Sequence, residues 1–159
     1  MNTGHSVFLG EFAGENDDLV DNYNTYIGYN SGYTNISGTN NTAIGRNAMY
    51  YGSTLNDYNV TMGYYAMNGL ASYSASDYNI ALGYYPLYSI NGGDYNIAMG
   101  YRPLYSHTTG ARNIAMGYYT MYDNTTGSDN IGMGYYSLAD NTSGGYNISM
   151  GYYAMRYNT

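Results

Sequence analysis

The chain has 159 residues and a formal charge of −7, with 11 acidic side chains against four arginines and no lysine. So few cations exclude the dense basic surface that binding to nucleic acid or to an anionic membrane requires, and the absence of cysteine excludes disulfides, thiol redox chemistry and thiolate metal sites. Ile, Leu, Val and Phe make up only 22 residues, about 14% of the chain and below the roughly 20% under which a chain is suspected of being disordered, whereas Gly, Tyr and Asn fill 69 positions.

The N-terminal residues, Met1 to His5, lack a basic region followed by an apolar stretch, so we expect no signal peptide in the chain as given. No apolar run approaches the roughly 20 residues that cross a bilayer as a helix, so we also expect no membrane insertion. The chain is then cytoplasmic, released by a route that needs no such signal, or a segment of a longer protein.

A repeat organises the chain from its first residues to its last. Nine glycines hold the same place in it, at intervals of 17, 18 or 20 residues. We number positions in each unit relative to this glycine, which is position 0, and call the nine units coils 1 to 9. The glycines are Gly10, Gly28, Gly45, Gly63, Gly83, Gly100, Gly117, Gly134 and Gly151. A unit of this length is too short for paired helices.

The residues before each glycine alternate between apolar and small side chains. Position −3 (the isoleucine column) is Ile, Val or Thr, position −1 (the methionine column) is Met, Leu or Ile, and position −2 (the small column) is usually Ala, Gly or Ser. This period of two predicts a short strand before each glycine. Position +4 (the core column) is Met or Leu in seven coils and glycine in coils 1 and 2, as Gly14 and Gly32. We expect the three apolar columns to stack into a thin continuous core.

Asparagine stands at position −4 in eight coils. We expect these side chains to form a buried ladder in which amides hydrogen-bond from coil to coil. The residues are Asn24, Asn41, Asn59, Asn79, Asn96, Asn113, Asn130 and Asn147. The columns predict an all-β fold over residues 1–159, a single parallel β-solenoid domain of about nine 17-residue coils with two short strands and two turns each. The alternative interpretation, a disordered low-complexity tract, does not require such regular columns.

The blocks Asn96-Ile97-Ala98-Met99-Gly100-Tyr101 and Asn41-Thr42-Ala43-Ile44-Gly45 resemble the head repeats of trimeric autotransporter adhesins. They are even more similar to the Asn-Thr-Ala-Ile-Gly-Tyr repeats of phage tail fibres and bacterial surface proteins, and the resemblance covers essentially the whole chain. It implies a left-handed parallel β-roll and a parallel homotrimer, in which the small column would suit close subunit contact or, equally, a crowded face within one monomer. The sequence as given shows no secretion signal, heptad stalk or membrane anchor, which fits a phage fibre segment better than a complete autotransporter.

Two adjacent tyrosine columns follow the glycine. The first, at position +1, supplies the candidate ligand-binding residues Tyr64, Tyr84, Tyr101, Tyr118, Tyr135 and Tyr152; the second, at +2, is Tyr65, Tyr85, Tyr119, Tyr136 and Tyr153, interrupted by Arg102; a third, at +5, is Tyr33, Tyr50, Tyr88, Tyr105 and Tyr122. Neighbours in a strand face opposite ways, so at most one of the first two columns can be internal unless a turn intervenes. An exposed column would offer rings for sugars to stack on. A purely structural one would stabilise the coils by aromatic contact.

We expect no enzyme activity, no cofactor and no metal site. His5 and His107 lie about six coils apart, too far for one catalytic or metal site, and both are expected in solvated turns. Asp57, Asp77 and Asp94 align at position −6, but nothing marks a pair of them as catalytic.

These observations predict a non-enzymatic structural or adhesive fibre protein, a tail-fibre or adhesin-head segment that presents tyrosine ladders to cell-surface glycans. We expect it in an extracellular surface fibre or a virion. Its partners would be copies of itself, as a homotrimer or end to end, with no nucleic acid among them. Two alternatives stay open: a self-assembling filament subunit of head-to-tail solenoids without a ligand, and an ice-binding protein.

Overall fold

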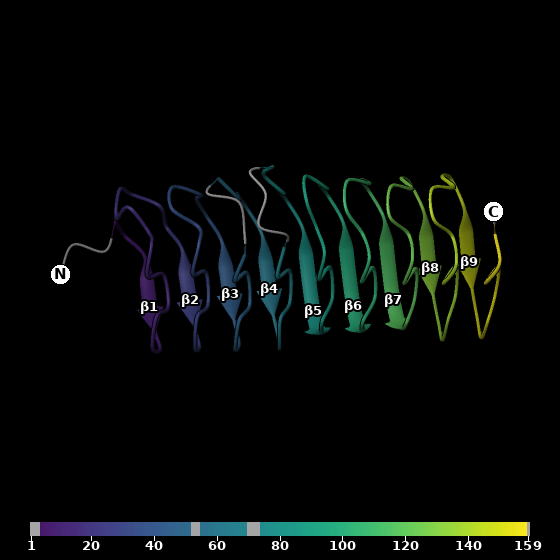
Figure 1. The fold of residues 1–159 in the computed structure, drawn as a ribbon, viewed down its shortest axis with the longest axis horizontal. Coiled ribbons are helices and arrows are strands. Elements are labelled where there is room, and N and C mark those ends of the chain that lie inside the picture. Colours follow the sequence, from purple (N-terminus) through teal and green to yellow (C-terminus); the bar gives the residue numbers. More distant parts are fainter. Residues whose placement is uncertain (1–3, 52–54, 70–73, 159) are drawn as a thin grey trace.

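The computed structural model describes residues 4–51, 55–69 and 74–158. Within these ranges the chain is all-β and contains no helix, so none could cross a membrane. Nine strands form one parallel sheet in chain order: β1 (Val7–Leu9), β2 (Thr25–Ile27), β3 (Thr42–Ile44), β4 (Val60–Met62), β5 (Ile80–Tyr84), β6 (Ile97–Tyr101), β7 (Ile114–Tyr118), β8 (Ile131–Met133) and β9 (Ile148–Met150). Figure 1 shows the coils following one another in a single row, with the two termini at opposite ends. The parallel β-solenoid predicted from the repeat is confirmed.

Neighbouring strands pair so that residues at the same position of the repeat lie side by side. Val7 pairs with Thr25, Ile97 with Ile114 and Ile131 with Ile148, so each isoleucine-column residue lies beside its counterpart in the next coil. The insertions before coils 2, 4 and 5 do not shift this register, because they fall in the turns between strands. Each column of the sequence is therefore a physical row of side chains along the solenoid.

In the described part of the chain, each coil contains one strand rather than the two we predicted. On the return side, the residues at positions +2 and +4 have positive φ, as at Tyr85 (55°) and Leu87 (49°), which takes the backbone out of the β region. This side is still bonded from coil to coil: the Tyr85 amide donates to Tyr64 O at 3.0 Å, and the Met67 amide donates to Pro86 O at 2.8 Å. The return side is thus a hydrogen-bonded wall of turns, built from left-handed residues that alternate along the chain.

The strands face the opposite way from our prediction. The small column is buried, as at Ala81, Ala98 and Ala115, whereas the isoleucine and methionine columns on either side of it point outward. Two of the three apolar columns therefore lie outside the core. The small column, in turn, cannot line a contact between subunits, because it faces the interior of its own chain.

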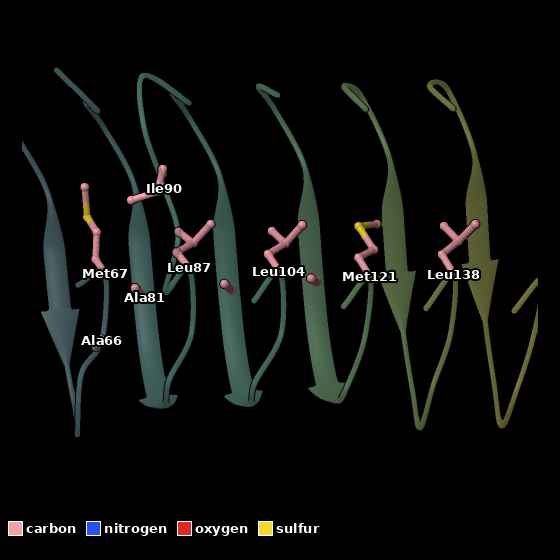
Figure 2. Packing of buried hydrophobic residues seen from close by; sticks show 10 residues of the cluster. Ala66, Met67, Ala81, Leu87, Ile90, Leu104, Met121 and Leu138 are labelled. Atoms are coloured by element: carbon pink, nitrogen blue, oxygen red, sulfur yellow. The ribbon is translucent and has the colours of Figure 1, made fainter. Parts of the chain in front are cut away.

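The interior is narrow, and this explains the direction of the strands. The core column fills it in single file, with Met67, Leu87, Leu104, Met121 and Leu138 between the strands and the return wall (Figure 2). A Cβ added to Gly132 in the small column would lie 2.9 Å from Thr120 Cγ2 and 3.0 Å from Met121 Cε. Only a small strand residue leaves room for a Met or Leu across from it.

Coils 1 and 2 reverse this distribution of volume. Their small-column positions hold Phe8 and Tyr26, whose rings stack with centroids 5.5 Å apart, and their core-column positions hold Gly14 and Gly32. A Cβ on Gly32 would lie 2.6 Å from ring atoms of Tyr26, and one on Gly14 would lie 2.8 Å from the ring of Phe8. The two columns therefore share a fixed volume, which either side can supply.

The glycine at position 0 is required by both conformation and space. At Gly134, φ is +127°, which L side chains rarely adopt, and an added Cβ would lie 2.5 Å from the carbonyl oxygen of Gly151 in the next coil. Consecutive coils touch backbone to backbone at this corner, so the repeat keeps glycine there in all nine coils.

Candidate functional site

The asparagine column forms a continuous ladder through the interior. The backbone N–H groups of Asn41, Asn59, Asn79, Asn96, Asn113, Asn130 and Asn147 each donate to Oδ1 of the asparagine one coil earlier, at 2.8 to 3.1 Å. The side-chain Nδ2 of Asn113 donates to Gly127 O in the next coil at 2.8 Å, and equivalent bonds recur along the column. All of these side chains except that of Asn147 are buried. Their polar atoms bond within the chain, so the column is structural and offers nothing to a ligand.

The first tyrosine column lies on the surface as a stack of rings. Ring centroids are 5.4 Å apart between Tyr64 and Tyr84 and 4.9 to 5.1 Å apart from Tyr84 through Tyr101, Tyr118 and Tyr135 to Tyr152, with interplanar angles of 5° to 16°. Each inner ring is therefore covered on both faces by its neighbours. What the column presents to solvent is ring edges and hydroxyls.

The second and third tyrosine columns are also at the surface, so neither of the first two columns is internal. Tyr84 and Tyr85 of one coil meet edge to face at 4.6 Å and 76°, and Tyr85 meets Tyr88 in the same way at 5.1 Å and 63°. Tyr88 in turn stacks on Tyr105 at 4.9 Å. The three columns thus make a herringbone array, stacked along the solenoid and edge to face around it, which is the geometry that the ring quadrupole favours.

Three arginines are inserted into this array at positions where other coils have an aromatic or apolar side chain. The guanidinium of Arg102 lies 5.4 Å from the ring of Tyr85 and 5.9 Å from that of Tyr119, filling the gap in the second column. Arg46 bridges Tyr29 and Tyr64, at 5.7 and 5.9 Å, in the first column. Arg156 takes the third-column position of coil 9, 5.1 Å from both Tyr136 and Tyr153. At each of these positions a guanidinium contacts the neighbouring rings where a tyrosine ring would otherwise stack on them. The arginines therefore fill gaps in the tyrosine columns.

Covered ring faces bear directly on glycan recognition. A sugar that stacks on an aromatic side chain needs a free face, and both faces of Tyr84, Tyr101 and Tyr118 are taken by neighbouring rings. Burial followed by repulsion from Tyr64 raises the pKa of Tyr85, so its hydroxyl is a neutral hydrogen-bonding group at physiological pH. The array is therefore built for internal contact, with a rim of hydroxyls outside.

A fourth tyrosine column was missed in the sequence. It stands at position −5, directly before the asparagine column, and comprises Tyr23, Tyr58, Tyr78, Tyr95 and Tyr146. Tyr58, Tyr78 and Tyr95 stack with centroids 4.9 Å apart and planes within 3°, and His5 stacks on Tyr23 at 5.2 Å. The recurring Tyr-Asn pair was the available signal, and it lies across the turn that precedes the strand.

The outward sheet face carries partly exposed apolar side chains along the whole row of strands. It consists of the isoleucine and methionine columns, and we call it the outer apolar face; its eighteen residues are all Val, Thr, Ile, Leu or Met. Side chains inside the row are half-buried by their neighbours in adjacent coils, while Ile148 and Met150 in the last coil are 68% and 66% exposed. Nine strands spaced about 4.8 Å apart and three residues wide give roughly 400 Å², within the range of about 300–600 Å² for the largest apolar patch of a monomer, a patch that is often functional.

The structure places the two histidines and the aligned aspartates in separate surroundings. His107 is fully buried, not solvated as we predicted: its two ring nitrogens lie 2.9 Å from Asn124 O and 2.7 Å from Gly110 O. It occupies an interior position that holds Asn124 and Asn141 in the next two coils. Burial lowers the pKa of His107, and the two carbonyls oppose that shift.

The aspartates at position −6 bond to the backbone of the preceding coil. The Asp57 amide donates to Asp77 Oδ1 at 2.8 Å, and the Asp77 amide donates to Asp94 Oδ1 at 2.9 Å. Across residues 4–51, 55–69 and 74–158, no group of three or more His, Asp and Glu is arranged to hold a metal ion.

No protein-family model, curated protein or solved structure matches the chain. Fold and surface together define its class, a tyrosine-rich parallel β-solenoid repeat protein with aromatic ladders and an outward apolar sheet face.

Proposed function

We propose that the protein is a non-enzymatic structural segment of an extracellular or virion fibre, a rigid rod that works as a parallel assembly of identical chains. The observation that carries this proposal is the outer apolar face, which runs over all nine strands without a charged residue. The largest apolar patch of a protein surface is often functional, and this one follows every strand of the sheet from one end of the rod to the other.

A second copy of the chain is the partner that fits this face best. The side chains of this face repeat at the strand spacing of about 4.8 Å. The same face of a parallel second copy has side chains at the same spacing. Side chains of two such faces interlock along their whole length, whereas a globular partner meets that spacing only locally. The resemblance to adhesin heads and tail fibres makes a homotrimer the expected arrangement.

Within such a rod we assign the tyrosine array to stabilisation of the coils. Its rings stack on one another rather than facing outward, and three of the four arginines contact its rings through their guanidinium groups. Adhesion to surface glycans would then use hydroxyls and turn residues instead of ring faces.

The proposal is tested by the mass of the assembly in solution. The purified chain should form trimers in analytical ultracentrifugation, and Ile97→Asp with Ile114→Asp should yield monomers with an unchanged circular dichroism spectrum, because both side chains point away from the core. Thr126→Asp, in an exposed turn, is the matched control and should stay trimeric. A wild-type chain that remains monomeric at high concentration would refute the proposal.

A further inference from the structure

The fourth tyrosine column contains a set of three rings that lie outside the herringbone array. Tyr58, Tyr78 and Tyr95, the stacked triad, come from coils 4, 5 and 6 and stack at 4.9 Å with planes within 3°. They are 49%, 46% and 55% exposed. Tyr78 is covered on both faces by the other two rings, whereas Tyr58 and Tyr95 each have one face covered by Tyr78.

The triad differs from the herringbone array in how its rings are held. In the array most rings meet a second ring of their own coil at a steep angle, as Tyr84 meets Tyr85 at 4.6 Å and 76°. Among the described residues, the triad rings have no aromatic contacts except with each other. No ring of another column therefore stands between them and an oxidant.

We propose that the stacked triad is an oxidative modification site, at which a peroxidase with hydrogen peroxide couples Tyr78 to Tyr58 or Tyr95 as dityrosine and so joins neighbouring coils covalently. Dityrosine requires two phenols held side by side with accessible carbons next to the hydroxyl. The triad provides such a pair on each side of Tyr78.

The coupling of two phenols consumes one hydrogen peroxide. Each of two phenols loses one electron and one proton to give a tyrosyl radical, and the two radicals form a bond between the carbons adjacent to their oxygens. The hydrogens on those carbons then transfer to the oxygens, which restores two phenols. The two electrons and two protons reduce one hydrogen peroxide to two waters.

The coupling removes a proton from each phenol together with an electron. Burial and the adjacent phenols Tyr58 and Tyr95 raise the pKa of Tyr78, so the ring is protonated at neutral pH and must release its proton when it is oxidised. The preceding residue, Asp77, is a carboxylate whose pKa is raised by burial, against the opposing effect of the hydrogen bond that it accepts from the Asp57 amide.

The product would lock the longest repeat of the chain. Gly63 and Gly83 are 20 residues apart, against 17 in later coils, and a bond between Tyr58 and Tyr78 would close this coil on itself. A carbon–carbon bond of this kind resists reducing agents, so it would give a chain without cysteine a permanent cross-link.

The test treats the full chain with a haem peroxidase and hydrogen peroxide, and maps dityrosine by fluorescence and by mass spectrometry of peptides. We expect linked peptides that lack two hydrogens and contain Tyr58 with Tyr78 or Tyr78 with Tyr95. Methionine oxidation adds oxygen and is distinguished by mass. Tyr78→Phe keeps the ring stack but should lose most of the dityrosine.

Tyr146→Phe is the matched control, because Tyr146 belongs to the same column, is 86% exposed and has no aromatic neighbour among the described residues. Its dityrosine yield should equal that of wild type. A mixture of isotope-labelled and unlabelled chains separates links within one chain from links between chains. Absence of dityrosine, links in the herringbone array or between chains instead, or an unchanged yield in Tyr78→Phe would each overturn the proposal.

Discussion

Exchanging the volumes of Tyr26 and Gly32 tests whether the small and core columns share one fixed space. Tyr26→Ala alone removes a fully buried ring and should destabilise the fold by about 3–5 kcal/mol. It also removes the bond from Asn35 Nδ2 to the Tyr26 hydroxyl, although Nδ2 keeps a second acceptor in Gly38 O. Gly32→Met alone drives a side chain into the ring of Tyr26, because even its Cβ would lie 2.6 Å from ring atoms. Overpacking of this kind costs about 1–3 kcal/mol or more.

The double variant reproduces the arrangement of coil 3, where Ala43 faces Met49. Gly32 has φ of 63° and Met49 already adopts 57°, so the backbone is compatible and the remaining cost is the left-handed conformation of a residue with a side chain, about 1–2 kcal/mol. If the two single changes are independent, their losses of unfolding free energy add to about 4–8 kcal/mol. The double variant should lose at least about 2 kcal/mol less than this sum.

Urea unfolding followed by circular dichroism measures these differences. Since solenoids can unfold in segments, hydrogen exchange at the Thr25 amide, which donates to Asn41 O at 2.8 Å, gives the local value for coil 2. The reciprocal exchange, Ala98→Tyr with Leu104→Gly, is the matched control and should show the same sign of coupling. A double variant at least as unstable as the sum of the single variants would refute the shared-volume argument.

Three further changes probe the ladder, the buried histidine and the glycine corner. Asn113→Ala removes the acceptor of the buried Asn130 amide and one of the two donors to Gly127 O, which keeps its bond from Asn124 Nδ2. It should lower the unfolding free energy by about 1–3 kcal/mol, whereas Thr126→Ala, in an exposed turn, should leave it unchanged in the same urea titration. Because burial lowers the pKa of His107 below its ordinary value of about 6.5, the unfolded chain binds a proton before the folded chain does, so stability should fall as the pH drops through about 6.5. His107→Asn should flatten that slope, and a stability that rises on acidification would contradict this account. Gly134→Ala should lower the thermal unfolding midpoint far more than Gly151→Ala. Both glycines have φ of 127°, but the nearest atom to an added Cβ is 2.5 Å away at Gly134 and 3.9 Å away at Gly151. Equal decreases in the midpoint would show that the backbone clash is unimportant.

The sequence predicted which residues stack on which because column identity and strand pairing are the same property in a solenoid with one repeat per coil. It did not predict which face of the strand is inside. A period of two fits both directions, and large apolar residues usually mark the core, so Ile114 and Met116 were placed inside instead of Ala115. The reciprocal pairs Phe8 with Gly14 and Tyr26 with Gly32 held the missing information, because their volumes compensate only if these positions face each other.

Side chains outside the strands were harder to place. The sequence left open whether the first tyrosine column exposes ring faces to sugars or stabilises the coils by aromatic contact. Its spacing along the sheet is the distance at which rings stack on one another, and mutual stacking covers the ring faces. Tyr78 was overlooked because it precedes a turn, outside the strand pattern. His107 was assigned to solvent as a lone titratable residue, although the asparagines at its position in later coils mark an interior place that needs hydrogen bonds.

Backbone hydrogen bonds join each coil to the next along the rod, as from the Ile97 amide to Asn113 O and from the Ile114 amide to Asn130 O, and this determines how the rod responds to tension. We expect a force applied to the two ends to break these bonds one coil at a time, whereas a shear force would act on all of them together. Each coil contributes only about 4.8 Å of length while folded, but its 17 residues can extend to nearly 60 Å once released. The unfolded chain of a coil is therefore more than ten times as long as the folded coil. A coil that unfolds under tension lengthens the rod before the chain is fully extended.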